Sequence, residues 1–270
     1  MNCIVWTADL HSNCIDQEMK NQFFTHLKNA RGDAILVGGD ISDGARSLQV
    51  LEEMALKTGK TIYFVLGNHD YYGESIATIR RQAIKMHTKN PHTVYLTRDG
   101  VVSLDNNTVL IGCDGWGDAK EGSSLDSTIV LNDFSEIEDF RALSPEELEK
   151  KLQELGDEAA ADLALLLERA FSQVNNVLFL THVPPFKSVC YFANKGTDRD
   201  WNPYFVCKST GDVLMQYLSK NPQKQCVVLC GHSHAKAFGQ ILPNLQVYVL
   251  GRADEGLPNF ELLEIPKLFS

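Results

Sequence analysis

Hydrophobic residues in the first third of the chain form short apolar runs that are separated by amphipathic segments. The runs lie at 3–8, 34–37 and 61–66, and their length and composition predict buried strands. Between and after them, apolar residues recur at helical spacing over 16–29, 45–58 and 74–90. This alternation predicts β-α-β units whose parallel strands are buried on both faces.

The rest of the chain adds shorter strands, two helices and two irregular stretches. Apolar runs predict strands at 93–96, 101–104, 108–113, 176–180, 226–230, 237–242, 245–250 and 260–265. Helices are predicted over 209–220 and from Ser144 to Gln173, where a Ser N-cap, a Pro and a capping-box Glu open the helix, although Gly156 could interrupt it. Stretches 114–135 and 183–208 show no sustained period, and we expect irregular loops that face the substrate.

The size and composition of the chain are those of one ordinary globular domain. A chain of 270 residues that is 44% hydrophobic can build one sizeable core, and no linker divides it, so we expect a single domain over 1–270. The net charge of −10 weighs against nucleic acid as a partner, because phosphate binding needs clustered Lys and Arg.

The sequence shows no signal for a membrane or for secretion. No apolar stretch approaches the ~18 residues needed to span a bilayer. The first residues lack the basic and apolar regions of a secretory leader. The seven cysteines show no disulfide-framework spacing and fit reduced thiols, so we expect a cytoplasmic protein without a membrane partner.

Polar residues of three types follow five of the predicted strands at their carboxyl ends. They are Asp9 and His11, Asp40, the trio Asn68, His69 and Asp70, then His182, and finally His232 and His234. The carboxyl ends of parallel strands share one edge of a sheet, and α/β proteins place their sites there. We therefore expect these side chains to meet.

Each of these motifs has an ordinary interpretation when it is taken alone. Asn, Asp and Gly are common turn residues, and two histidines one residue apart can belong to a histidine-rich loop. Five of the eight histidines nevertheless fall at these strand ends. The repeated placement favours one shared site over five unrelated turns.

The residue types at these strand ends are suited to metal binding. Imidazole together with carboxylate favours metals such as Zn, Mn and Fe over Ca or Mg. Seven of the residues at the strand ends are candidate ligands: Asp9, His11, Asp40, Asn68, His182, His232 and His234. They exceed what one metal needs, whereas two metals that share a carboxylate would use them all, with His69 and Asp70 left over. The sequence therefore predicts a site for two metal ions, with Mn, Fe or Zn as the candidates.

The set of motifs resembles the calcineurin-like metallophosphoesterase superfamily. The blocks that carry the resemblance are Asp9-x-His11, Gly39-Asp40, Gly67-Asn68-His69-Asp70, His182 and Gly231-His232-Ser233-His234. It implies an α/β fold, a four-layer α/β/β/α sandwich with a dinuclear site at one edge. The implied ligands are Asp9, His11 and His234 for one metal, Asn68, His182 and His232 for the other, and Asp40 as the bridge.

The resemblance also implies an activity, the hydrolysis of a small phosphate mono- or diester. A hydroxide held between the two metals would attack phosphorus in line. His69 would contact the phosphoryl oxygen or protonate the leaving group, and Asp70 would orient the ring of His69. Nucleotides and cyclic nucleotides are among the candidate substrates.

Details of the motifs separate this chain from some branches of the superfamily. No Arg follows Asp43, unlike the corresponding block of the protein Ser/Thr phosphatases, and Asp70 stands where those enzymes have Glu. Lipid A-precursor hydrolases usually have Arg at the place of His69. The pattern looks most like the bacterial cyclic-nucleotide phosphodiesterase and general phosphohydrolase branch. A nuclease and a scaffold without chemistry are the alternatives, although scaffolds of the superfamily typically lose ligands.

The two irregular stretches supply the candidates for substrate binding. Trp116 or Trp201 could stack on a base, and Arg199 could hold a phosphate. Asp118, two residues after Trp116, could tune the site. Alternatively, the two tryptophans anchor their loops. The sequence does not indicate an oligomeric state.

Overall fold

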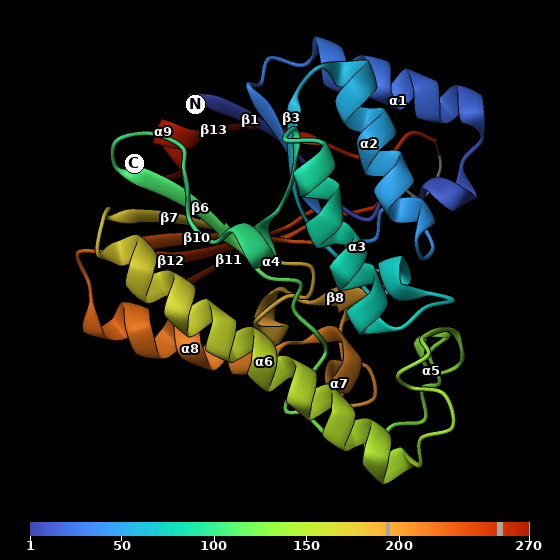
Figure 1. Ribbon diagram of the computed structural model, residues 1–270. Coiled ribbons are helices and arrows are strands. Elements are labelled where there is room, and N and C mark those ends of the chain that lie inside the picture. The colour runs from blue at the N-terminus through green and yellow to red at the C-terminus, as the bar shows by residue number, and fades with distance from the viewer. Residues whose placement is uncertain (193–194, 253–255, 270) are drawn as a thin grey trace.

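Two mixed β-sheets form the centre of the molecule in the computed structural model, which describes residues 1–192, 195–252 and 256–269 (Figure 1). The first sheet has the order β13-β1-β2-β3-β4 and the second the order β11-β12-β10-β7-β6-β5. The first consists of β13 (Glu261–Glu264), β1 (Cys3–Thr7), β2 (Ala34–Gly38), β3 (Thr61–Val65) and β4 (Thr93–Tyr95). The second consists of β11 (Ala237–Leu242), β12 (Leu245–Val249), β10 (Gln225–Cys230), β7 (Asn176–Leu180), β6 (Thr108–Gly112) and β5 (Val102–Ser103).

Long helices cover the outer face of each sheet. Those over the first sheet are α1 (Gln17–Asn29), α2 (Arg46–Thr58) and α3 (Ile76–Lys89), and those over the second are α6 (Pro145–Phe171) and α8 (Lys208–Lys220) (Figure 1). Side chains alternate along the strands, so Val5 packs with the helical layer while Ile4 and Trp6 pack between the sheets. The result is the predicted four-layer α/β/β/α sandwich, and the prediction of the fold is confirmed.

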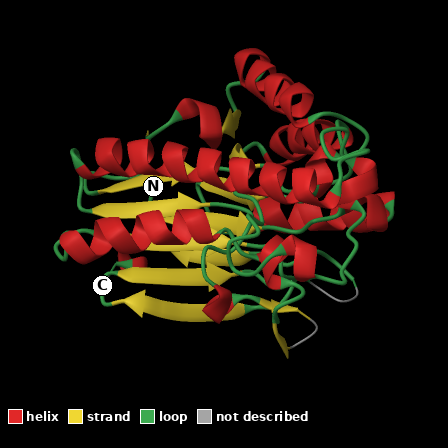
Figure 2. Cartoon of the chain, turned by 90° about the horizontal axis from the view of Figure 1, so that it is seen from below, coloured by secondary structure: helices red, strands yellow, loops and turns green. Residues whose placement is uncertain are grey.

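Both sheets direct the carboxyl ends of their parallel strands to one side of the molecule. β1, β2, β3 and β4 pair in parallel, as do β6, β7, β10 and β12 in the second sheet. Figure 2 shows the arrowheads of these strands pointing toward the side where most loops gather. Polar residues that follow these strands are thereby delivered to one region.

The longest helix is continuous through the residue that could have broken it. Ser144 caps α6 and forms the predicted capping box with Glu147. Gly156 lies inside this helix, where an added Cβ would approach the Cβ of Asp118 to 2.3 Å. The glycine therefore permits a close contact with the 114–135 loop and does not end the helix.

The stretches predicted to be irregular contain short elements. The first holds η3 (Ser124–Asp126) and α5 (Asp133–Glu136), and the second holds η4 (Lys187–Val189), β8 (Tyr191–Phe192), β9 (Lys195–Gly196) and α7 (Asn202–Phe205). Residues 193–194 of the second stretch lie outside the described residues. The other short helices are η1 (Ser12–Cys14), η2 (His69–Tyr71), α4 (Leu96–Asp99) and α9 (Ile265–Leu268), and α4 replaces the end of the predicted strand 93–96.

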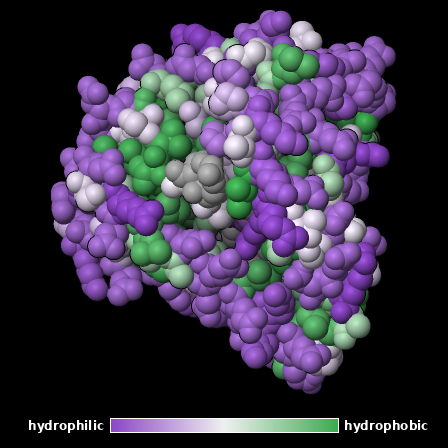
Figure 3. Space-filling model, viewed as in Figure 1, coloured by the Kyte–Doolittle hydropathy of each residue, from purple (hydrophilic) through white to green (hydrophobic). Residues whose placement is uncertain are grey.

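The surface is mostly polar on the face shown in Figure 3, with apolar residues gathered left of centre. Within the described ranges, no helix has the length and apolar character needed to cross a membrane.

Candidate metal centre

Six buried or half-buried acidic and imidazole side chains meet where the strands of the two sheets end. They fall into two groups, Asp9, His11, Asp40 and His234 on one side and Asp40, His182 and His232 on the other. Within each group, the atoms that could bind a metal lie within 4.8 Å of one another. Asp40 belongs to both groups, as a bridging ligand of two metals would.

The first group brings together the ends of β1 and β2 and the loop after β10. The Nε2 atom of His11 lies 3.6 Å from Oδ2 of Asp40 and 3.2 Å from Nε2 of His234. Asp9 completes the group, and its carboxylate accepts the backbone N–H of His232 at 2.9 Å. All of these nitrogen and oxygen atoms converge from elements that are far apart in sequence.

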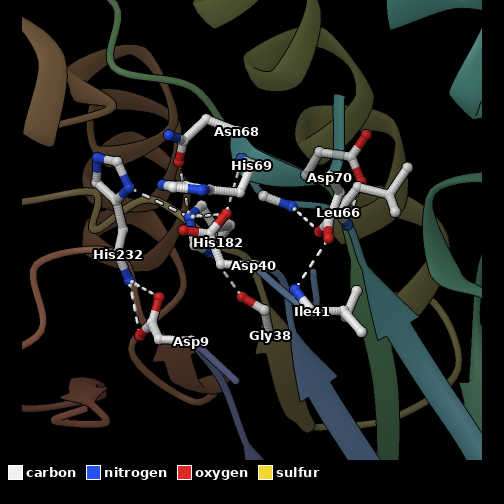
Figure 4. Close-up of polar contacts among 12 residues, drawn as sticks. Asp9, Gly38, Asp40, Ile41, Leu66, Asn68, His69, Asp70, His182 and His232 are labelled. Atoms are coloured by element: carbon white, nitrogen blue, oxygen red, sulfur yellow. Dashed lines mark hydrogen bonds and ion pairs between the residues drawn. The ribbon is translucent and has the colours of Figure 1, made fainter. Parts of the chain in front are cut away.

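The second group is arranged around His182, which follows β7. Its Nε2 atom lies 3.4 Å from Oδ1 of Asp40, 3.2 Å from Nδ1 of His232 and 3.2 Å from Oδ1 of Asn68 (Figure 4). Asn68 thereby joins the group with its amide oxygen, a neutral ligand atom. The structure thus assembles the two ligand sets that the resemblance implies.

Backbone carbonyls determine which imidazole nitrogen faces the centre. The Nδ1 atom of His182 donates to the carbonyl of Gly38 at 2.8 Å, and Nε2 of His232 donates to the carbonyl of Tyr204 at 3.1 Å. Because each proton is held by a carbonyl, the other ring nitrogen carries the lone pair that a metal requires. The donor set therefore fits two metal ions.

The backbone of these residues adopts a conformation that side chains disfavour. Seven non-glycine residues of the described chain have positive φ, and five of them are residues of this cluster: Asp9, His11, Asp40, His232 and His234. Such conformations cost about 1–3 kcal/mol each and concentrate at functional sites. Strained backbone conformations at these residues thus direct their side chains toward one another.

Glycines before the ligands allow the strand ends to approach. At Gly67, an added Cβ would lie 2.3 Å from Oδ1 of Asp40 and 2.7 Å from Nε2 of His182. At Gly39, which has a φ of +87°, it would lie 2.7 Å from Nδ1 of His182. The glycines of the Gly-Asp and Gly-Asn-His-Asp blocks are therefore required by close packing against the ligands.

We expect Gly67→Ala to weaken metal binding, because the new Cβ would lie 2.6 Å from the backbone N of Asp40 as well as against two of the clustered side chains. The new methyl group would displace Asp40 and His182, which both lie in the ligand groups, so affinity for both metals should fall by about 10- to 100-fold. A metal titration monitored by calorimetry measures the affinity for each metal. Gly196→Ala is the matched control, since a Cβ there would meet no atom within 4 Å. Equal metal affinities in the two variants would contradict the prediction.

Burial and mutual charge set the protonation of the cluster. Burial lowers the pKa of His11 and His232 to about 3 and that of His234 to about 4, so these rings are neutral at pH 7. Burial would raise the pKa of Asp40, but the charge of His182 holds it well below its usual value, and Asp40 in turn raises the pKa of His182 to about 10. Burial and the mutual charge of Asp40 and His182 therefore act together on the protonation of the centre.

His69 lies beside the cluster and leaves its ring partly open to solvent. Nδ1 of His69 lies 3.2 Å from Oδ1 of Asp43, and the ring stacks on Tyr72 with centroids 4.4 Å apart. Burial would lower the pKa of His69, but the charge of Asp40 and the hydrogen bond to Asp43 raise it. The ring can therefore hold a proton near neutral pH.

The prediction that Asp70 orients His69 is wrong. Asp70 is fully buried, and its two oxygens accept hydrogen bonds from the backbone N–H groups of Ile41, Ser42 and Gly67 and from the hydroxyl of Ser47. Successive side chains in a 3₁₀ turn point about 120° apart, so His69 and Asp70 diverge. Figure 4 shows Asp70 turned toward Ile41, and the carboxylate that contacts the ring of His69 is that of Asp43.

A cleft of about 210 Å³ opens onto the cluster. Its walls are formed by Asp40, Asn68, His69, His232 and His234 together with Tyr72, Leu131, Asn132, Asp133, Phe192, Trp201 and Phe205. Three of these form an aromatic wall: Phe192 lies 4.7 Å from Trp201 between ring centroids, and Phe205 lies 4.5 Å from the ring of His232. A polar floor and an apolar wall meet in one cleft.

Of the four candidate substrate contacts, only Trp201 lines this cleft. Trp116 is buried against Tyr71 and Phe140, and the fully buried Asp118 accepts the backbone N–H of Ser209. Arg199 is largely exposed and pairs with Asp126 at 3.4 Å. Trp116 and Asp118 fold back into the core, whereas Arg199 is exposed and pairs with an acidic residue of the other loop, so the structure places none of these three residues at the cleft.

The cleft and the surroundings of His69 also contain residues to which the sequence gave no role in the site. Tyr72 and Asp43 lie within or beside recognised motifs, so their spacing was a usable signal. Phe192, Phe205 and Asp133 lie in the two irregular stretches, where no periodic pattern marked them.

Comparison with known proteins agrees with the arrangement of the fold and the centre. The family model for calcineurin-like phosphoesterases matches residues 4–236, so the chain belongs to this family. This membership and the fold identify a metal-dependent phosphoesterase, and the family together with the Asp and His cluster supports a two-metal site. No curated protein matches the chain.

Solved structures of similar fold come from several organisms. Phosphopantetheinyl hydrolase (PptH) from Mycobacterium tuberculosis has 12% identity and a TM-score of 0.64, covering 92% of this chain and 89% of its own. A dimetal phosphatase from Danio rerio has 13% identity and a TM-score of 0.61, with 92% and 87% covered. The protein TT1561 of Thermus thermophilus has 16% identity and a TM-score of 0.58, with 98% and 95% covered. At these identities the similarity shows the fold alone.

Proposed function

We propose that the chain hydrolyses small organic phosphate mono- or diesters, with nucleotides and cyclic nucleotides among them, in the cleft above the cluster. The observation that carries the proposal is the continuity of the two ligand groups with a partly aromatic cleft of about 210 Å³. This volume lies below the roughly 300–1,000 Å³ that is usual for drug-sized ligands, which favours a small ester. The net charge of −10 offers no general attraction for nucleic acid.

The donor set supports Mn, Fe or Zn as the metals. Asp9, His11, His234 and Asp40 would hold one ion, and Asn68, His182, His232 and Asp40 the other. When bound, two such cations would neutralise charge on the phosphoryl oxygens and make water acidic enough to act as a nucleophile.

Two side chains of the protein would then take part in protonating the leaving group. When the ester P–O bond breaks, the departing oxygen needs a proton, and His69 lines the cleft with a raised pKa that keeps one available. Asp43 would hold the ring of His69 in place from its far side. His69 therefore serves as general acid in this proposal, and Asp43 as its positioning residue.

The organic part of the ester would lie against the aromatic wall. Trp201 packs against Phe192 and Phe205, so its ring is held in a fixed orientation at the cleft. A flat or apolar group placed there would be removed from water while the phosphate remains at the polar floor.

We expect Asp43→Asn to shift the alkaline limb of the kcat profile to lower pH. The hydrogen bond to Asp43 contributes to the raised pKa of His69, so its loss lowers that pKa. A general acid works only while protonated, and activity would then be lost at a lower pH as the pH rises. Profiles of kcat against pH for both proteins test this, and an unchanged alkaline limb would argue against the pairing.

A substrate panel tests the proposed function. The metal-loaded protein is assayed with Mn, Fe and Zn on p-nitrophenyl phosphate, bis-p-nitrophenyl phosphate, 2′,3′- and 3′,5′-cyclic nucleotides and single-stranded DNA. We expect turnover of one or more small esters. A preference for DNA would support a nuclease instead, and no turnover at full metal occupancy would support a non-catalytic scaffold.

The thiols support a reducing compartment, and we propose the cytoplasm. All seven cysteines are free, and six of them are buried. Burial raises the pKa of Cys207 to about 11, which keeps this thiol protonated and unreactive.

A further inference from the structure

Asp133 is a carboxylate at the edge of the cleft that no sequence motif marks. It begins α5 in the 114–135 loop and is only 6% exposed. Within the described parts of the chain, its side-chain partners are two neutral donors. Its Oδ1 atom accepts Nδ2 of Asn68 at 3.0 Å and the hydroxyl of Tyr72 at 2.6 Å. The charge of the neighbouring His69 favours this carboxylate, but its burial away from water is still costly, so its position calls for a functional reason.

The contact with Asn68 determines which end of the amide faces the centre. A carboxylate only accepts hydrogen bonds, so it must face the NH₂ group of the amide. The amide oxygen then points the other way, to 3.2 Å from Nε2 of His182. A reversed amide would present N–H groups to the cluster, which cannot bind a cation.

The contact with Tyr72 reaches the second functional side chain of the cleft. The ring of Tyr72 stacks on His69 with centroids 4.4 Å apart and planes inclined by 30°. The same oxygen of Asp133 that holds Asn68 thus also holds the ring on which His69 rests.

The segment that carries Asp133 is attached firmly to the turn after Asn68. The backbone N–H of Gly73 donates to the carbonyl of Glu136 at 2.8 Å, and that of Glu138 donates to the carbonyl of Glu74 at 3.1 Å. Ile137 is fully buried beside these bonds. The loop can therefore place its carboxylate with the precision that positioning requires.

We propose that Asp133 is a positioning residue of the metal centre, which presents the amide oxygen of Asn68 to a cation and holds Tyr72 against His69. The inference rests on the proposed function for its use in catalysis. Its effect on metal binding stands independently of the substrate.

Metal titration of the protein separates this role from a merely structural one. We expect Asp133→Ala to weaken the same metal equivalent that Asn68→Ala weakens, by about 10- to 100-fold, and to leave the other within about threefold. Asp133→Asn keeps an oxygen at the Oδ1 position and should restore most of the affinity. Glu136→Ala, an exposed carboxylate on the same helix, is the matched control and should bind both equivalents normally.

A double-mutant cycle completes the test. If Asp133 acts through Asn68, then Asn68→Ala with Asp133→Ala should bind metal no more weakly than Asn68→Ala alone. Additive losses, or equal losses at both metals together with a lower melting temperature of the metal-free protein, would overturn the proposal. If Asp133→Ala does not fold, the variants Asp133→Asn and Tyr72→Phe decide. Tyr72→Phe should lower kcat and leave metal affinity unchanged. If both variants lose as much metal affinity as Asn68→Ala does, the proposal is overturned.

The metal-affinity readouts are independent of the proposed reaction, whereas the kcat of Tyr72→Phe rests on it. Metal affinity is measured with Mn alone, without any ester. Failure of every substrate in the panel would therefore refute the proposed function and leave the result for Asp133 intact.

Discussion

Replacing Asp40 by asparagine is expected to remove both metal ions and to lower kcat/KM by about a thousandfold, since losing several kcal/mol of charge stabilisation corresponds to that factor. Asp40 is the one carboxylate shared by the two ligand groups. It also accepts the backbone N–H of His69 at 3.0 Å, a bond that the amide oxygen of asparagine can keep. The change therefore removes charge with little loss of packing.

Elemental analysis of protein purified without chelator measures the metal content, and circular dichroism verifies the fold. Asp118→Asn is the matched control, because Asp118 is as buried as Asp40 but lies outside the cleft. It should retain both metals. Retention of one tightly bound metal by Asp40→Asn would show that the two sites do not depend on a shared carboxylate.

Replacing His69 by alanine is expected to lower kcat by about 10²- to 10⁴-fold, the usual contribution of a general acid, while metal content stays near that of the unchanged protein. His69 lines the cleft but belongs to neither ligand group. The loss should be larger for an alkyl ester than for p-nitrophenyl phosphate, because a better leaving group depends less on protonation.

Kinetics on both esters and metal analysis of the same preparation test the role of His69. The control variant is His26→Ala. His26 is exposed on α1 and does not line the cleft. Loss of metal along with activity would make His69 a ligand, and equal losses for both esters would exclude it as the acid.

The pattern of strands and their endings was enough to predict parallel β-α-β units and the cluster, whereas the four-layer sandwich was implied by the resemblance of the motifs to a known family. Buried parallel strands produce continuous apolar runs, which stand out in a sequence. Residues such as Asp9, Asp40 and His182 directly follow those runs, so the shared sheet edge brings them together. The motif glycines could be recognised but not explained, since only the structure shows that Gly67 packs against Asp40.

The sequence could not predict which carboxylate contacts the ring of His69. Asp70 is its neighbour in the chain, yet a tight turn sends the two side chains apart, and Asp43 reaches the ring from the loop after β2. The irregular stretches were equally uninformative: Trp116 became a core residue, whereas Trp201 lines the cleft.

The sequence by itself determined the class of fold, the family and the residues that gather at the sheet edge, because all of these depend on local periodicity and on the residue types at the end of each strand. Only the tertiary structure decided which carboxylate supports which side chain, which aromatic residues face the cleft, and that Asp133 holds Asn68. Those contacts join segments far apart in the chain, and their geometry arises from packing that no local pattern records.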